Sequence, residues 1–168
     1  AREVWRVDRP SARRRGLMRE ASLSAAEPFA RFPEDIVGNF LLAADLAPQL
    51  CPGCASYHLQ YTMRRAVRHL AYGKGEHALD RQEIVALLAR LLVAREFNDR
   101  VPIEVTIAGS VDTGLLAMAA EAAGSAGLVE RVRFTVLDRC PTPLVLCSAF
   151  ARRHGLTVAV QSADLLGR

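Results

Sequence analysis

Apolar residues recur along this chain with two different spacings, and the change of spacing divides the chain into two halves. Between residues 34 and 98 they recur every three or four positions, which is the period of an amphipathic helix. Beyond Pro102, short runs of β-branched and apolar residues alternate with segments of helical pattern. This order predicts an all-helical N-terminal region followed by a β-α-β-α-β unit.

Three helices are predicted in the first half. The first covers residues 34–47 and ends where Pro48 removes a backbone donor, and the second covers residues 55–72. The third begins at a capping box made by Asp80 and Glu83 and continues to Glu96. Its apolar side chains fall on one stripe, formed by Ile84, Leu87, Leu88, Leu91 and Leu92.

The second half predicts three strands joined by two helices. The strands cover residues 103–107, 132–137 and 156–161, and the helices cover residues 115–123 and 140–154. Helical connections between strands produce a parallel sheet. The predicted fold is therefore α/β, with an incomplete parallel sheet of three strands preceded by the helical region.

The turn after the first strand carries the features of a ligand site. Gly109 and Gly114 lie at its two ends, and the helix that follows points its positive end and bare backbone N–H groups into the turn. The neighbouring strand ends at Asp138, whose carboxylate can accept hydrogen bonds from both hydroxyls of a ribose. Ligands of open α/β sheets bind beyond the carboxyl ends of the strands. The pattern predicts a cofactor that contains a nucleoside.

These residues resemble the N-terminal half of a class I S-adenosylmethionine-dependent methyltransferase with a Rossmann-like core. The resemblance covers residues 100–166, and the helical region is similar to the cap that such enzymes often carry. Asp138 matches the residue that grips the ribose, and residues 162–164 match those that meet the adenine. The resemblance implies methyl transfer from S-adenosylmethionine to a small-molecule acceptor. The cofactor-binding residues that it implies are Ala108, Gly109, Ser110, Asp112, Gly114, Asp138, Arg139, Ala163 and Asp164.

The loop departs from the family pattern. Val111 and Asp112 stand where a middle glycine is expected, and Ile107 replaces an acidic residue before the first glycine. A side chain inside the loop limits how closely a cofactor approaches the backbone. Asp112 is a candidate to face the methionine ammonium instead of the missing carboxylate. Two alternatives stay open: another nucleotide-binding α/β protein, and a non-catalytic scaffold or regulatory protein that acts through the helical half and the basic arm.

One face of the second predicted helix carries aromatic and basic residues, namely Tyr57, Tyr61, Arg64 and Arg68. In one interpretation the helix packs its aromatic rings on the domain and leaves the arginines in water. In the other it covers the cofactor crevice, with His58 or Tyr61 as the catalytic residue and an arginine bound to a carboxylate.

Cys51, Cys54 and His58 have the spacing of part of a zinc site. A closed site needs a fourth ligand, and His69, His77, Cys140 and Cys147 are the candidates. In the simplest interpretation the cysteines are small buried or turn residues and no metal is bound. A zinc site and a redox-active thiol pair remain open as alternatives.

Net charge, chain length and the number of cysteines limit which domains, partners and compartments we expect. The 168 residues carry a net charge of +4, and the first twenty residues, with seven arginines and three acidic residues, account for this surplus. We therefore expect a basic irregular arm over residues 1–33, a helical cap over 34–98 and a cofactor-binding half-domain over 99–168. A nucleic-acid partner is not expected outside the arm.

No apolar run reaches the roughly 20 residues that cross a bilayer, so no membrane partner is expected. Four cysteines without a secretion signal favour the reducing cytoplasm. An incomplete sheet leaves an open edge, so we expect a second copy or a further C-terminal half to complete it.

Overall fold

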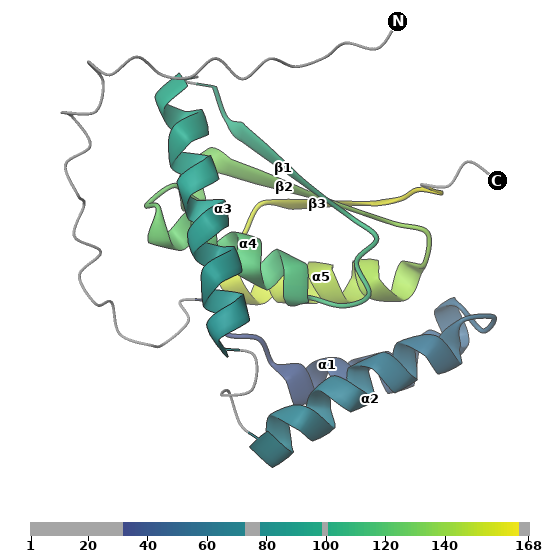
Figure 1. Cartoon of the computed structure of the whole chain (residues 1–168). Helices are drawn as coiled ribbons and strands as arrows, with labels where there is room; N and C mark the ends of the chain where they lie inside the picture. Colours follow the sequence, from purple (N-terminus) through teal and green to yellow (C-terminus); the bar gives the residue numbers. More distant parts are fainter. Residues whose placement is uncertain (1–31, 73–77, 99–100, 165–168) are drawn as a thin grey trace, which may run out of the picture.

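The computed structural model describes residues 32–72, 78–98 and 101–164, and Figure 1 shows their arrangement. Residues 1–31 of the predicted arm, which covers residues 1–33, lie outside the described residues. The elements follow in the order α1 (Ile36–Leu50), α2 (Ala55–Tyr72), α3 (Ala78–Asn98), β1 (Ile103–Ala108), α4 (Gly114–Ser125), the 3-10 turn η2 (Val129–Arg131), β2 (Val132–Asp138), α5 (Pro141–His154) and β3 (Val158–Ser162).

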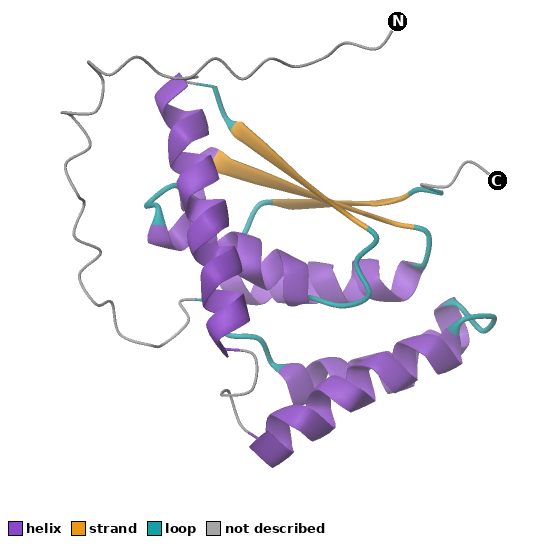
Figure 2. Ribbon diagram, in the orientation of Figure 1, coloured by secondary structure: helices purple, strands orange, loops and turns teal. Residues whose placement is uncertain are grey.

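The three strands form one parallel sheet in the order β1-β2-β3. Ile107 of β1 pairs with Val136 of β2, and Val136 pairs in turn with Val160 of β3. Helices α4 and α5, which connect the strands, both lie on the same face of the sheet (Figures 1 and 2). The predicted α/β fold, with helices preceding a three-strand parallel sheet, is confirmed.

The core lies between the sheet and the connecting helices. Phe134 and Val136 of β2 and Leu116 of α4 are fully buried there, together with Cys147 of α5. The buried side of α4 consists largely of alanine, and small side chains allow a helix to lie close to a sheet. The opposite face of β1 is exposed at alternate residues, among them Glu104 and Thr106, as expected for a sheet covered on one side.

Helix α3 belongs to the same packed layer because it contacts α4 and β1. Its predicted apolar stripe is divided: Leu88 and Leu92 pack into the core, whereas Ile84, Leu87 and Leu91 are exposed. The helical half therefore consists of two parts. Helices α1 and α2 form an antiparallel hairpin, with α1 contacting α5 (Figure 1), and α3 completes the α/β layer.

Two predicted helix boundaries are wrong. Helix α1 continues past Pro48 to Leu50; the proline stands in the last turn, so only one hydrogen bond is lost and the helix need not stop there. Helix α3 begins at Ala78, which places Asp80 inside its first turn instead of at the cap. Its negative charge is still favourable there, because it lies near the positive end of the helix.

The first residue of β3 and the N-terminal cap of α1 also differ from the prediction. β3 begins at Val158, two residues later than predicted, because Gly155 closes α5 in a left-handed conformation with φ of 64° and the chain then needs a short connection. Helix α1 is capped by Asp35, whose Oδ1 accepts a hydrogen bond from the N–H of Gly38 at 2.8 Å. Among the described residues, no helix is long and apolar enough to cross a membrane.

Candidate functional site

The carboxyl ends of the three strands bring Gly109, Asp138 and Ala163 to one edge of the sheet. The N–H of Gly109 donates to the carbonyl of Leu137 at 2.9 Å, and the N–H of Ala163 donates to the carbonyl of Asp138 at 3.0 Å. Parallel pairing aligns strand ends in this way, so residues far apart in the sequence become neighbours. The predicted ribose residue is therefore adjacent to the predicted glycine turn, and the predicted adenine residues lie one strand further along, beside Asp138.

Gly109 has the backbone conformation and the open surroundings that a ligand contact needs. Its φ is +71°, in the left-handed region that favours glycine. A Cβ placed on it would meet no heavy atom within 4 Å. Ala108, Arg139 and Asp164 beside it are exposed, so this end of the sheet is accessible.

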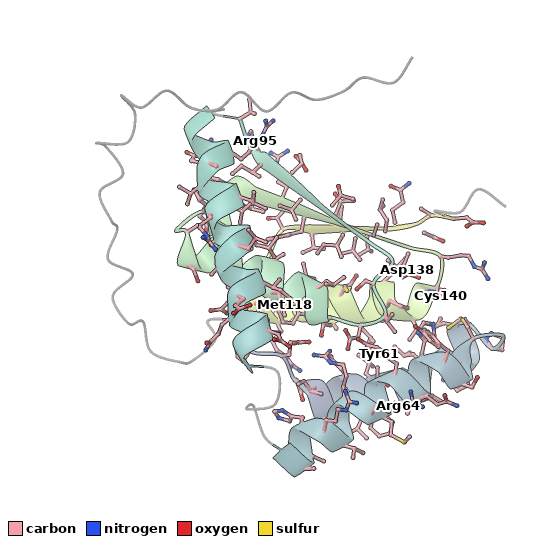
Figure 3. All side chains as sticks on the ribbon, in the orientation of Figure 1. Tyr61, Arg64, Arg95, Met118, Asp138 and Cys140 are labelled. Atoms are coloured by element: carbon pink, nitrogen blue, oxygen red, sulfur yellow. The ribbon has the colours of Figure 1, made fainter. Side chains whose placement is uncertain are left out.

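Asp138 is held in one orientation by its own turn. Its Oδ1 accepts a hydrogen bond from the backbone N–H of Cys140 at 2.7 Å, an Asx turn that fixes the carboxylate. Among the described residues its Oδ2 has no hydrogen-bond partner. Figure 3 shows Asp138 and Cys140 at the β2–α5 connection, with Tyr61 and Arg64 on the helix hairpin below.

The turn between β1 and α4 is closed by its own side chains. The Ser110 hydroxyl donates to the carbonyl of Asp112, and Asp112 Oδ1 accepts the N–H of Gly114 at 2.9 Å. The expected bare N–H at the start of α4 is therefore occupied. Ser110 and Asp112 are both buried, and Ser110, Asp112 and Gly114 are hydrogen-bonded to one another within the turn.

Glu34, Arg65, Arg81, Asp112 and Thr113 form a second group, which we name the ionic cluster. Arg65 pairs with Asp112 on the turn and with Glu34 at 3.1 Å, and Arg81 of α3 reaches Glu34 at 3.0 Å. The Thr113 hydroxyl donates to Glu34 Oε1 at 2.8 Å. The cluster thus joins the segment before α1, two helices and the glycine turn.

In the ionic cluster, ion pairs and hydrogen bonds together shift the pKa values of Glu34 and Arg65 more than burial does. Burial of Glu34 would raise its pKa, but the charge and hydrogen bonds of Arg65, with smaller contributions from Thr113 and Arg81, hold the pKa below its ordinary value. Burial of Arg65 would likewise lower its pKa, and the two carboxylates raise it instead. Glu34 and Arg65 are therefore both charged at neutral pH.

The sequence predicted that an arginine of this helix would bind a carboxylate, but it did not single out Arg65. Arg64 and Arg68, which share a face with Tyr57 and Tyr61, are both exposed. Arg65 meets the two acids because its direction around the helix, one residue beyond Arg64, points at the glycine turn. A pair of acids at residues 34 and 112 has no local spacing that could have revealed this contact.

The two catalytic candidates on α2 differ in access. His58 is 3% exposed, and its Nε2 lies 3.5 Å from Cys54 Sγ. Burial lowers the pKa of His58, and the nearby charge of Asp138 only partly opposes this. Tyr61 is 38% exposed; burial and the charge of Asp112 raise its pKa, so its hydroxyl keeps its proton at neutral pH.

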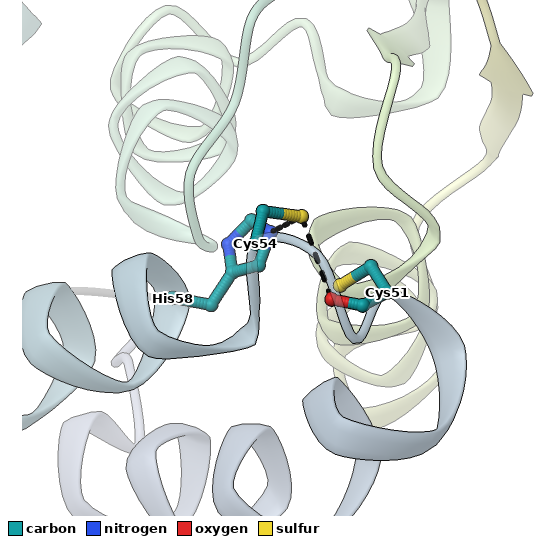
Figure 4. A group of neighbouring side chains, drawn as sticks. All are labelled: Cys51, Cys54 and His58. Carbon is teal, nitrogen blue, oxygen red and sulfur yellow. Dashed lines mark hydrogen bonds between the residues drawn. The ribbon is translucent and has the colours of Figure 1, made fainter.

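Cys51, Cys54, His58 and Cys140 form a third group, which we name the sulfur cluster. The ligand atoms of the first three lie within 4.8 Å of one another (Figure 4), and Cys140 Sγ lies 3.2 Å from Cys54 Sγ. Of the other proposed fourth ligands, Cys147 is buried against Asp112 and Ser110, and His77 lies outside the described residues. Three atoms, the sulfurs of Cys51 and Cys54 and a nitrogen of His58, are therefore spaced so that they could hold a metal ion, and the sulfur of Cys140 lies beside one of them.

Comparison of the chain with protein-family models, curated proteins and solved structures gives no match.

Proposed function

We propose that the protein binds S-adenosylmethionine at the carboxyl end of its sheet and transfers the methyl group to a small-molecule acceptor. The observation that carries the proposal is the pairing of an open, left-handed Gly109 with the oriented carboxylate of Asp138 on the next strand. A nucleoside at this edge has its ribose hydroxyls facing Asp138 Oδ2 and its base near Ala163 and Asp164. The order of strands, with both connecting helices on one face, supports the same assignment.

The residues that would hold the cofactor form a smaller set than the sequence implied. Ala108, Gly109, Asp138, Arg139, Ala163 and Asp164 line the accessible strand ends. Ser110, Asp112 and Gly114 support the turn from within through their own hydrogen bonds. Asp112, neutralised by Arg65, stabilises the turn instead of facing an ammonium group.

The chemistry asked of the chain is mainly positioning. S-adenosylmethionine supplies an electrophilic methyl group, so aligning an acceptor with that methyl accounts for much of the rate. Tyr61 is the catalytic candidate that an acceptor can reach, and its protonated hydroxyl can orient an acceptor oxygen or nitrogen by a hydrogen bond.

Isothermal titration of the full chain with S-adenosylmethionine and with its demethylated product tests this proposal. Asp138→Asn keeps an oxygen that accepts the Cys140 N–H but removes the charge that binds two hydroxyls. We expect affinity to fall roughly tenfold or more, since a hydrogen bond to a charged group contributes about 1.5–3 kcal/mol. Asp45→Asn, at an exposed site on α1, is the matched control and should bind as the unaltered chain does.

A scaffold or regulatory role is the second candidate, and the closed turn favours it. Backbone and side-chain groups that a cofactor would use are already bonded to Asp112. A folded chain that binds neither ligand would reject the methyltransferase proposal and support the scaffold.

The same proposal includes partners and a compartment. The outer edge of β1 pairs with no strand among the described residues, so a second copy or a longer form of the chain would complete the sheet there. A cavity of about 300 Å³ lies between α3 and this edge strand, and it is lined by Leu88, Leu91, Leu92 and their neighbours. This apolar cavity can accommodate side chains of the added segment. All four cysteines are free thiols, which suits a reducing cytoplasm.

A further inference from the structure

The sulfur cluster brings together residues from two separate connections of the fold. Cys51 ends α1, Cys54 precedes α2, and His58 lies one helical turn further along α2. Cys140 comes from the other half of the chain, at the N-terminal cap of α5. The turn between the first two cysteines is tight, with the N–H of Cys54 donating to the carbonyl of Cys51 at 3.0 Å.

The separations of the ligand atoms fit a small tetrahedral ion. Zinc bonds of about 2.3 Å to sulfur and about 2.0 Å to nitrogen place neighbouring ligand atoms roughly 3.5–3.8 Å apart. Cys54 Sγ lies 3.5 Å from His58 Nε2 and 3.2 Å from Cys140 Sγ. Cys51 Sγ lies within 4.8 Å of both Cys54 Sγ and the His58 ring. Three of the four ligand atoms therefore lie close enough to share one ion, and the Cys140 side chain, whose Sγ is beside Cys54 Sγ, would have to turn toward the other two to complete the set.

The sulfur cluster contains a buried polar atom that lacks a hydrogen-bond partner among the described residues. Cys51 and His58 are both buried, and His58 Nδ1 has no hydrogen-bond partner among the described residues. A buried imidazole that is not fully partnered loses free energy relative to one in water. A metal bond to Nε2, the nitrogen that faces Cys54 Sγ, would fix the orientation of this ring.

We propose that Cys51, Cys54, His58 and Cys140 bind one zinc ion. Three sulfurs and an imidazole nitrogen are the donor set that favours zinc over calcium or magnesium, and four protein ligands make a closed, structural site. On binding, each of the three thiols gives its proton to solvent and becomes a thiolate, and the histidine binds as the neutral ring. No electron is transferred.

The ion would clamp the α1–α2 hairpin to the β2–α5 connection. The Cys51–Thr142 contact, with Sγ and Oγ1 2.9 Å apart, already holds these two segments together beside the cluster. Cys140 stands two residues after Asp138 and provides the N–H that orients the Asp138 carboxylate. The clamp therefore fixes the part of the sheet edge on which the proposed nucleoside site depends, although zinc binding itself does not require that function.

A disulfide between Cys54 and Cys140 is the competing use of these sulfurs. Their separation of 3.2 Å would have to shrink to about 2.05 Å. Such a bond gives no role to Cys51 or to His58, whose ligand atoms lie within 4.8 Å of each other and of Cys54 Sγ, so the geometry favours the ion.

Zinc content of the full chain, purified under reducing conditions with zinc supplied, tests the proposal directly. Mass spectrometry of the metal should give one zinc ion per chain. Replacement by Co²⁺ should give the visible absorption of tetrahedral cobalt bound to thiolates, a signature that does not depend on any variant folding. The Cys54→Ser chain should lose the metal, and Cys140→Ser should weaken binding by roughly tenfold or more because three ligands remain.

Two controls separate this site from cysteine or histidine content in general. Cys147→Ala and His69→Asn should each keep one zinc ion per chain, because neither side chain belongs to the cluster. A folded chain that contains no zinc and gives no cobalt–thiolate bands would overturn the proposal. Metal retained in Cys54→Ser, or a Cys54–Cys140 disulfide in the protein isolated under reducing conditions, would overturn it as well.

Discussion

The ionic cluster and the sulfur cluster hold the same helix hairpin against the same end of the sheet, but they differ in how completely their atoms are partnered. In the ionic cluster the Glu34 and Asp112 side chains, only 4% and 7% exposed, both pair with Arg65. In the sulfur cluster His58 Nδ1 has no hydrogen-bond partner among the described residues, and Cys54 Sγ lies 3.2 Å from Cys140 Sγ. In the first cluster each carboxylate already has a cation beside it, whereas in the second the proposed zinc ion would supply the cation.

Removing the central cation of the ionic cluster should have the largest effect on stability. Arg65→Met leaves buried Asp112 without a cation and Glu34 with Arg81 alone, and we expect a loss of about 3–5 kcal/mol in the free energy of unfolding, measured by urea titration. Arg64→Met, the exposed neighbour on α2, should change it by about 0.5 kcal/mol or less. Equal effects of the two substitutions would show that the ionic cluster does not hold the hairpin.

Withdrawing zinc should have the next largest effect. A ligand held at about a hundred times its Kd stabilises the folded state by about 2.7 kcal/mol, so chelation should lower Tm by roughly 5–10 °C. Differential scanning calorimetry with and without a zinc chelator measures this shift. In Cys54→Ser the chelator should leave Tm unchanged, and a shift that persists in this variant would place the metal elsewhere.

Acid should act on the ionic cluster through Glu34. Its pKa is lower in the folded chain than the ordinary value of 4.5, so the folded state binds its proton more weakly than the unfolded state does. The stability it contributes is present above pH 4.5 and is lost as the pH falls from there through the folded pKa. Glu34→Gln should flatten this part of a plot of unfolding free energy against pH, and an unchanged slope would contradict the pairing.

The smallest expected effect on stability comes from adding a methyl group at Gly114, beside the Arg65–Asp112 ion pair. A Cβ on Gly114 would lie 3.1 Å from Asp112 Oδ1 and 3.3 Å from Arg65 Nη1. Asp112 is held by two partners and cannot easily move, so we expect Gly114→Ala to destabilise by up to about 1 kcal/mol despite the helix preference of alanine. Gly53→Ala, where a Cβ meets nothing within 4 Å, is the control and should be nearly neutral in thermal unfolding.

The elements of the α/β half were predictable because their signals are local. β-branched runs at 103–107 and 132–137, and the glycine at residue 155 that ends a helix, each specify a structure within a few residues. Errors appear where local rules compete with packing. Helix α1 continues past Pro48. The apolar stripe of α3 is only partly covered, because only one side of this helix packs against the core.

The candidate sites were only partly predictable for the same reason. The spacing of Cys51, Cys54 and His58 is visible in the sequence, as is the position of Asp138 at a strand end. Cys140 and Arg65 could not be chosen from their competitors, because their partners lie 86 and 47 residues away along the chain. The sequence alone determined which segments are strands and helices, since those preferences depend on neighbouring residues. Only the tertiary structure decided which charges and sulfurs meet, because packing the hairpin against the sheet edge sets distances that no local pattern records.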